Sequence, residues 1–181
     1  MEKDIEFSNR MREFYNNKAK NLFEGKYEYK RWFSTKEKRR QYYFSTLSLL
    51  YNLKNIEFKN CLEVGCGPGT WTKLLIKKYP KAKFTCLDIS KEMIAQFKDN
   101  VKAKNAKAIV NNFLEHDFKK DKFDFIFSSR AIEYIPDKPK VIKKFYDLLV
   151  PGGKCLIVTS PPHPLAFRIK RMLGKKVNWQ H

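Results

Sequence analysis

The sequence lacks any long hydrophobic run, and no apolar stretch approaches the roughly 18–20 residues that a membrane-spanning helix needs. Its first ten residues, MEKDIEFSNR, contain no apolar core of a secretory signal. Cysteine is scarce: the four cysteines form no Cys-x-x-Cys pair, and no histidine stands at metal-ligand spacing from them. We therefore expect a soluble, cytoplasmic protein with neither a disulfide framework nor a metal site.

Acidic residues are also few, because 19 Asp and Glu stand against 38 Lys and Arg, for a formal net charge of +19. Residues 1–60 carry 14 basic and 8 acidic side chains, residues 61–160 carry 19 and 11, and residues 161–181 carry 5 and none. An excess that is spread along the chain indicates solvated helix faces and does not favour a nucleic-acid partner. With 43% hydrophobic residues, the 181-residue chain can bury the core of one domain.

From residue 60 onward, short apolar runs alternate with amphipathic segments. The runs are typical of parallel strands buried on both faces, and they occupy residues 61–64, 84–87, 108–110, 123–127 and 155–159. Their cysteines are expected to be buried as small hydrophobes: Cys61, Cys86 and Cys155. Helices are expected over residues 70–79, 90–101 and 138–149, with Ser90 and Asp137 as N-caps. This alternation predicts a doubly wound α/β sheet.

The segment before residue 60 is polar and rich in aromatic residues. Ser34 and Glu37 form a capping-box pattern that predicts the start of a helix. Apolar residues then recur at helical spacing, so we expect one buried helix face made of Tyr43, Phe44, Leu47, Leu50 and Tyr51.

The strongest chemical signal is LEVGCGPGTWTKLL, where an expected strand leads into Gly65, Gly67 and Gly69 and then into a helix. Glycine lets the backbone turn tightly and approach a ligand closely. A dinucleotide fingerprint needs a glycine at position 70, which is Thr70 here. Asp88, at the end of the next expected strand, can accept hydrogen bonds from both hydroxyls of a ribose. These features indicate an adenosine-containing ligand without a pyrophosphate and disfavour an NAD(P) oxidoreductase.

Four motifs extend this pattern: LEVGCGPG, FTCLDIS, KFDFIFSSRAIEYIPD and VPGGKCLIVTSP. In order and spacing, over about residues 58–160, they resemble class I S-adenosylmethionine-dependent methyltransferases. The resemblance implies a Rossmann-like, mostly parallel sheet with flanking helices, and S-adenosylmethionine as the cofactor, with S-adenosylhomocysteine as its product. The family's sheet normally ends in a further strand pair, but only about 21 residues follow the fifth expected strand. We expect that pair to be missing, either because the chain is a fragment or because a partner covers the edge.

The resemblance also implies cofactor contacts around the glycine loop. Glu63, Gly65 and Gly67 would line the methionine end of the cofactor. Asp88 would hold the ribose, and Ile89 would lie against the adenine.

Four further cofactor contacts follow from the same resemblance. Asn112 stands where the family usually has an acid that accepts from the adenine amino group, and its side-chain oxygen can accept the same bond. Phe113 would give a backbone contact and a wall beside the ring, Ser129 would lie beside the methyl group, and Tyr15 would close over the cofactor. The alternative for Asn112 is a turn residue.

A general base is needed only if the acceptor must lose a proton before methyl transfer. Glu133 lies where many relatives have a Glu-His pair, although Tyr134 replaces the histidine, and it can equally cap the neighbouring helix. His163 follows the fifth expected strand on the side where such sheets bind substrates, or it simply precedes a helix. Residues 128–130 read SSR where amino-methylating nucleic-acid enzymes carry Asn/Asp-Pro-Pro-aromatic. The resemblance therefore favours a small-molecule or lipid-like acceptor.

We divide the chain into an N-terminal lid or cap (1–57), a cofactor-binding α/β core (58–160) and a basic amphipathic helix with a tail (161–181). The lid's aromatic residues either close over the cofactor or pack the first helix on the sheet; they are Tyr27, Tyr29, Trp32 and Phe33. Two other functions stay open: an RNA methyltransferase that uses the basic surface, and a non-catalytic cofactor-binding module whose helix 164–173 lies on anionic lipid. The oligomeric state is left open.

Overall fold

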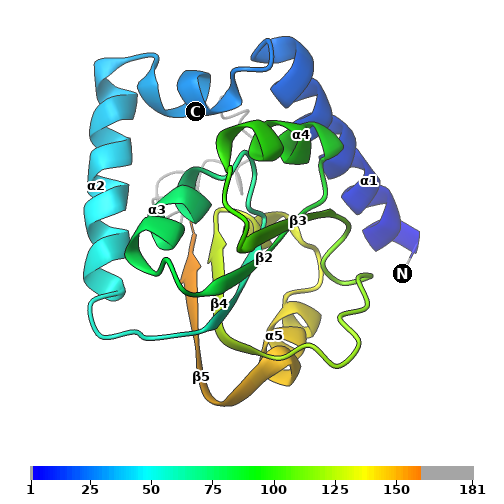
Figure 1. The fold of residues 1–181 in the computed structure, drawn as a ribbon. Helices are drawn as coiled ribbons and strands as arrows, with labels where there is room; N and C mark the ends of the chain where they lie inside the picture. Colours follow the sequence, from blue (N-terminus) through cyan, green and yellow to red (C-terminus); the bar gives the residue numbers. More distant parts are fainter. Residues whose placement is uncertain (1, 160–181) are drawn as a thin grey trace, which may run out of the picture.

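The computed structural model describes residues 2–159, which fold around a five-stranded sheet of order β3-β2-β1-β4-β5 (Figure 1). All four strand pairs are parallel. The strands are β1 (Asn60–Val64), β2 (Lys83–Asp88), β3 (Ala106–Val110), β4 (Phe123–Ser129) and β5 (Leu149–Val158). The α-helices are α1 (Glu2–Asn17), α2 (Lys36–Asn52), α3 (Thr70–Lys78), α4 (Lys91–Asn100) and α5 (Lys138–Leu148). The predicted Rossmann-like α/β fold is confirmed.

The two faces of the sheet carry separate apolar cores, because alternate side chains of each strand point to opposite faces. On one face, Cys61 and Phe125 pack with buried residues of α2, α3 and α4. On the other face, Leu62 and Ile126 pack with buried residues of α5. The central strand β1 is therefore covered on both sides, and the chain after it must leave the sheet at its carboxyl edge.

The predicted caps of α4 and α5 are confirmed. The Ser90 hydroxyl accepts a hydrogen bond of 3.2 Å from the Met93 N–H, and the Asp137 carboxylate accepts one of 3.0 Å from the Lys140 N–H. The predicted Ser34 cap of α2 is wrong, because Thr35 is the N-cap. The Ser34 hydroxyl instead donates to the carbonyl of the preceding helical turn.

The predicted buried face of α2 is wrong in most of its members. Tyr43, Phe44, Leu47 and Tyr51 are between 45% and 79% exposed, and the helix buries Leu49 instead. Relative to the predicted orientation, the helix turns a neighbouring face to the core. On that face, Tyr42 stacks on the Trp71 ring of α3, with 5.6 Å between ring centroids.

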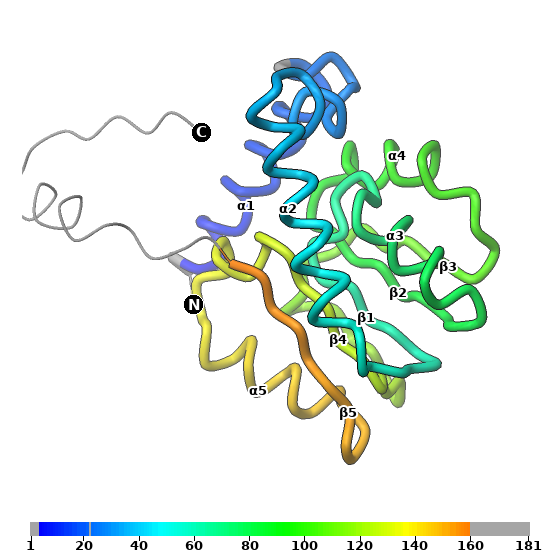
Figure 2. Tube along the Cα trace, turned by 90° about the vertical axis from the view of Figure 1, so that its left-hand side faces the viewer, coloured from blue at the N-terminus to red at the C-terminus, as the bar shows by residue number. Residues whose placement is uncertain are grey.

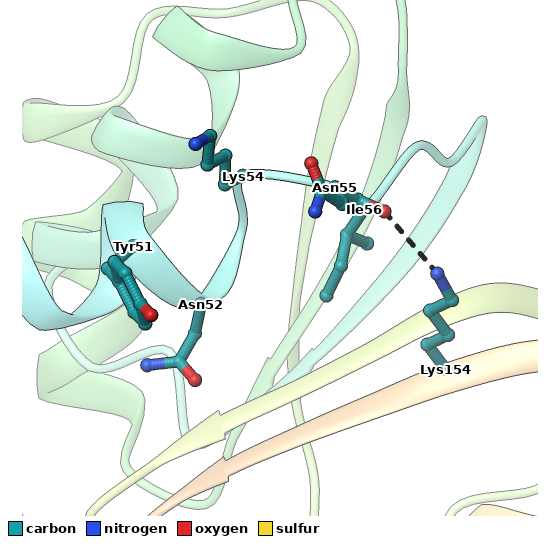
Figure 3. Close-up of a pocket in the computed structure, with 6 residues that line it drawn as sticks. All are labelled: Tyr51, Asn52, Lys54, Asn55, Ile56 and Lys154. Atoms are coloured by element: carbon teal, nitrogen blue, oxygen red, sulfur yellow. Dashed lines mark hydrogen bonds between the residues drawn. The ribbon is translucent and has the colours of Figure 1, made fainter.

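The strand β5 forms an edge of the described sheet. Cys155 is exposed there, so its predicted burial is wrong, whereas Cys61 and Cys86 are buried as predicted. Beside this strand, a hollow opens between β5 and the turn that joins α2 to β1; its lining residues are Tyr51, Asn52, Lys54, Asn55, Ile56 and Lys154 (Figure 3). The Lys154 ammonium donates to the Asn55 carbonyl at 3.4 Å across this hollow.

The segment that joins α1 to α2 passes above the carboxyl ends of the strands, with α1 and α2 descending on either side (Figures 1 and 2). Asn16 accepts a 2.8 Å hydrogen bond from the Ser90 hydroxyl, and Glu28 forms a 2.8 Å ion pair with Lys73 of α3. These contacts hold the N-terminal segment on the core. Within residues 2–159, no helix is both long and apolar enough to cross a membrane.

Candidate functional site

The loop between β1 and α3 is built on three glycines in the left-handed backbone region. Their φ angles are +75° at Gly65, +53° at Gly67 and +85° at Gly69. A Cβ on Gly65 would lie 2.0 Å from the Cβ of Ala131, so the loop packs directly against the turn after β4. A Cβ on Gly67 would meet nothing within 4 Å. The middle of the loop therefore presents bare backbone to open space, at the point where strand order reverses beside β1 and a ligand binds in such sheets.

Asp88 joins this loop to the start of α4. One carboxylate oxygen accepts a 2.9 Å hydrogen bond from the Gly67 N–H, and the other accepts one of 2.9 Å from the Ser90 N–H. Burial raises the pKa of Asp88, and these backbone hydrogen bonds oppose the shift. Each oxygen keeps a lone pair for a further donor. The carboxylate thus holds the loop in place and can also accept a hydrogen bond from a ligand hydroxyl.

Glu63 lies near the end of β1 as a buried carboxyl group. Its side chain is 1% exposed, and one carboxyl oxygen accepts a 2.5 Å hydrogen bond from the Thr72 hydroxyl. Burial raises the pKa of Glu63 to about 8, with the Thr72 hydrogen bond opposing. Glu63 is therefore bonded to the first turn of α3 through Thr72, and its contact with the cofactor stays a prediction.

Asn112 and Phe113 follow β3 and turn inward. The Asn112 side-chain oxygen accepts a 3.0 Å hydrogen bond from the Leu114 N–H, and its amide donates to Glu115 at 2.8 Å, as in a turn. The Phe113 ring is buried in the core against Phe118 and Phe145. The adenine contacts of both residues stay predictions.

The N-terminal segment brings Tyr15 to the carboxyl edge of the sheet. Its ring contacts that of Tyr134 edge-on, with 5.7 Å between centroids. Burial strongly raises the pKa of Tyr15, and Tyr134, Tyr27 and Asp88 raise it further. The structure therefore brings Tyr15 and Asp88 into one neighbourhood, 73 positions apart in the chain.

The turn after β4 supplies the other candidates. Ser129 ends β4 and Ile89 directly follows β2, and both are half-buried at this edge. Glu133 accepts a 2.9 Å hydrogen bond from the Arg130 side chain, so its carboxylate is ion-paired. Arg130 itself has φ +58°, a left-handed conformation that costs a residue with a side chain about 1–2 kcal/mol. His163, the second predicted base, lies outside the described residues, as does the helix predicted over 164–173.

The predicted lid divides into two parts. Trp32 is buried against Trp71, with ring centroids 5.5 Å apart, so it packs the N-terminal segment on the core. Tyr29 is exposed. Tyr27 is tied to α4, because its N–H donates to the Gln96 side chain at 3.2 Å, and burial raises the pKa of its phenol to about 12.

Sequence reasoning missed Arg130, whose side chain forms an ion pair with Glu133 at this edge. Its one signal was its place directly after a predicted strand. Among residues 2–159, no group of three His, Cys, Asp or Glu side chains is placed to hold a metal ion.

Comparison with known proteins agrees with this geometry. Residues 61–153, just over half of the chain, match the family model described as a methyltransferase domain. Malonyl-[acyl-carrier protein] O-methyltransferase 2 of Ilyobacter polytropus is 35% identical over 104 residues, which are 57% of this chain and 40% of that protein. Demethylmenaquinone methyltransferase of a Geobacillus species is 32% identical over 115 residues, which are 61% of this chain and 49% of that protein. The matched part thus spans less than half the length of these relatives.

A solved structure shares the fold. Phosphoethanolamine N-methyltransferase 2 of Haemonchus contortus, in complex with phosphomonomethylethanolamine and S-adenosylhomocysteine, superposes with a TM-score of 0.60 and 22% identity. The superposition covers 74% of this chain and 33% of that one. Since the family match spans the glycine loop, Asp88 and the turn after β4, the chain belongs to the methyltransferase-domain family, within the class I S-adenosylmethionine-dependent methyltransferases.

Proposed function

We propose that this protein binds S-adenosylmethionine above the glycine loop and transfers its methyl group to a small-molecule or lipid-like acceptor. The observation that carries the proposal is the Asp88 carboxylate, which is held by the Gly67 and Ser90 N–H groups beside bare loop backbone. Two vicinal ribose hydroxyls can donate to a carboxylate in that setting. A pyrophosphate would instead need the glycine that Thr70 replaces.

Each part of the site has a separate task in this proposal. Gly65 and Gly67 let the methionine end of the cofactor approach the backbone, while Asp88 fixes the ribose. The N-terminal segment acts as the lid, which is supported by the hydrogen bond of Asn16 with Ser90, two residues from Asp88. The division into a lid (1–57), a core (58–160) and a C-terminal tail (161–181) stays a prediction.

S-adenosylmethionine, when bound, supplies a methyl group on a positively charged sulfur. The protein has to hold the acceptor atom in line with that methyl group and exclude water. Glu133 is held by Arg130 as an ion-paired carboxylate, which supports a positioning role over proton abstraction. The described residues thus support catalysis by orientation.

The relatives support the choice of acceptor. Their names specify malonyl-[acyl-carrier protein] and demethylmenaquinone as acceptors, and neither is a nucleic acid. Residues 128–130, SSR, also lack the motif of amino-methylating nucleic-acid enzymes. A cytoplasmic location stays a prediction from the sequence.

A transfer assay tests the proposed reaction. The protein is incubated with methyl-labelled S-adenosylmethionine and either a deproteinised small-molecule and lipid extract or total RNA, with Asp88→Ala as the inactive control. We expect label in small molecules or lipids with the wild type and none with the variant. Label in RNA alone would establish the RNA methyltransferase alternative and contradict the proposed acceptor class.

A further inference from the structure

Helix α4 carries side chains that reach both the N-terminal segment and the glycine loop. The helix (Lys91–Asn100) lies beside α1 (Figure 1). At its start, the Asn16 side-chain oxygen accepts hydrogen bonds from the Ser90 hydroxyl at 2.8 Å and from the Glu92 N–H at 3.4 Å. The last turn of α1 is therefore fastened to the first turn of α4.

Gln96 ties a second stretch of the N-terminal segment to the middle of α4. Its side-chain oxygen accepts a 3.2 Å hydrogen bond from the Tyr27 N–H, and its side-chain amide donates to the Ala19 carbonyl at 3.3 Å. Residues 19 and 27 lie on either side of the turn at residues 23–25, and Ala19 is fully buried. One side chain thus uses both its acceptor and its donor to hold this turn on the core.

Asn100, one helical turn further along, contacts the glycine loop. Its side-chain amide donates to the Pro68 carbonyl at 3.0 Å. The end of α4 also packs closely against the loop, because a Cβ on Gly69 would lie 2.4 Å from a methyl carbon of Val101 and 3.0 Å from the Phe97 ring. The second half of the loop is therefore held by the end of α4.

The contacts with the segment and with the loop belong to one rigid element. Gln96 and Asn100 are four positions apart, so they lie on one face of α4. At the other end of the helix, the Asp88 carboxylate accepts from the Gly67 and Ser90 N–H groups at 2.9 Å each. Rigid helices can carry energetic coupling between the groups that they contact. A displacement of α4 that follows the segment therefore also moves the partners of the loop.

We infer that Gln96 and Asn100 are positioning residues, an inference that rests on the proposed function. Gln96 holds the N-terminal segment on the core, and Asn100 holds the glycine loop in the shape that receives the cofactor. Neither side chain needs to touch the cofactor. Because both act through α4, docking of the segment and binding of the cofactor are coupled, and each favours the other by the same factor.

Calorimetry with S-adenosylhomocysteine measures this coupling in wild type, Gln96→Ala, Asn100→Ala, the double variant and the control Lys98→Ala, whose side chain is exposed on α4. Alanine is a better helix former than glutamine or asparagine, so the substitutions do not weaken α4 itself. Each single site variant should lose about threefold to tenfold in affinity, the effect of one hydrogen bond.

The double variant distinguishes coupled from independent contacts. Its loss in affinity should be smaller than the product of the two single losses, because each contact works fully only while the other is present. Losses that multiply would overturn the inference. An affinity equal to that of Lys98→Ala in either single variant would overturn it as well.

Trypsin measures the docking of the segment directly, because Lys18, Lys20 and Lys26 offer cleavage sites within it. Cleavage within residues 60–158 reports global unfolding and is the internal reference. Saturating S-adenosylhomocysteine should slow cleavage of the segment in wild type and in Lys98→Ala. In Asn100→Ala the protection should be weaker by about threefold or more, since the coupling is reciprocal. Equal protection in all these proteins would contradict the coupling.

The proposed function and this inference can fail separately. If S-adenosylhomocysteine does not bind the wild type, the proposed function fails, and trypsin cleavage without ligand becomes the test. Faster cleavage of the segment in Asn100→Ala than in Lys98→Ala then supports coupling through α4, because the hydrogen bond removed in Asn100→Ala belongs to the loop. Equal rates in the two variants contradict it.

Discussion

Asp88 and Glu63 are carboxyl groups on neighbouring strands whose surroundings give them different tasks. Asp88 accepts two backbone N–H groups at the edge of the sheet and stays available to a ligand. Glu63 accepts hydrogen bonds from the Thr72 hydroxyl and the Cys86 thiol and lies in the core. At residue scale, the partners differ in kind: backbone N–H groups hold Asp88, whereas buried side chains hold Glu63.

The pH dependence of stability reports on Glu63. Burial raises its pKa from the ordinary 4.5 to about 8, so the folded state holds a proton that the unfolded state has released between these values. The free energy of unfolding should therefore fall by up to about 1.4 kcal/mol per pH unit across that window and level off above it.

Glu63→Gln removes the titrating group and keeps a neutral acceptor for Thr72, so the variant should lack the part of the pH-dependent fall in unfolding free energy that Glu63 causes. Urea unfolding between pH 5 and 9 measures the free energy of unfolding of both proteins. Parallel curves for wild type and variant would show that Glu63 is not the group responsible.

Gly67 tests whether the open space above the loop is a ligand site. Gly67→Ala keeps a φ of +53° and should lose about 1–2 kcal/mol of stability, with no clash. Gly152→Ala is the matched control, since Gly152 has φ +77°, equal space and a place near the start of β5.

Both alanine variants should lose similar stability in thermal unfolding. Only Gly67→Ala should also lose about tenfold or more in affinity for S-adenosylhomocysteine, because its new methyl group occupies the approach to the loop. Equal affinities of the two variants would place the ligand elsewhere.

At the scale of elements, α2 presents two leucines in contrasting settings. Leu49 is 4% exposed and belongs to the core, whereas Leu47 is 45% exposed. Leu49→Ala should cost about 2–5 kcal/mol of unfolding free energy, and Leu47→Ala less than about 0.5 kcal/mol. Urea unfolding of the two variants measures both. A cost for Leu47→Ala as large as that for Leu49→Ala would show that a further segment or partner covers this face.

Strands and helices after residue 60 could be predicted because their signals are local. Ser90 and Asp137 are caps visible in the sequence, and the parallel strands are short apolar runs. The start of β5 could not be predicted, because residues 151–153, Pro-Gly-Gly, read as a turn but lie in the strand beside a register shift. Which face of α2 is buried, and that Cys155 is exposed, depend on neighbours from distant sequence.

In the candidate site, too, local features could be predicted and contacts between distant segments could not. The glycine loop and Asp88 are local patterns, and each stands at the end of a parallel strand, so both lie at the carboxyl edge of the sheet. Tyr15 and Tyr134 are in ring contact because the N-terminal segment lies across the carboxyl ends of the strands (Figures 1 and 2). No spacing in the sequence encodes that contact.

At the scale of the whole molecule, the positive charge is dispersed. Lysines of α5 pair locally with acids, as Lys140 does with Asp137 at 2.9 Å and Lys143 with Asp147 at 2.6 Å. Such exposed pairs contribute little stability but place acids among the lysines. The distribution agrees with solvated helix faces.

The proposed function requires that the protein bind an adenosyl cofactor through Asp88. Calorimetric titration with S-adenosylmethionine, S-adenosylhomocysteine and NAD measures this binding in wild type, Asp88→Ala and the control Asp99→Ala, an exposed acid of α4. Because hydrogen bonds to a charged group contribute about 1.5–3 kcal/mol each, losing two should lower affinity at least 100-fold. We expect both adenosyl ligands to bind wild type and Asp99→Ala equally, to bind Asp88→Ala at least 100-fold more weakly, and NAD to bind none of the three proteins. NAD binding, or equal adenosyl affinity in all three proteins, would contradict the proposal.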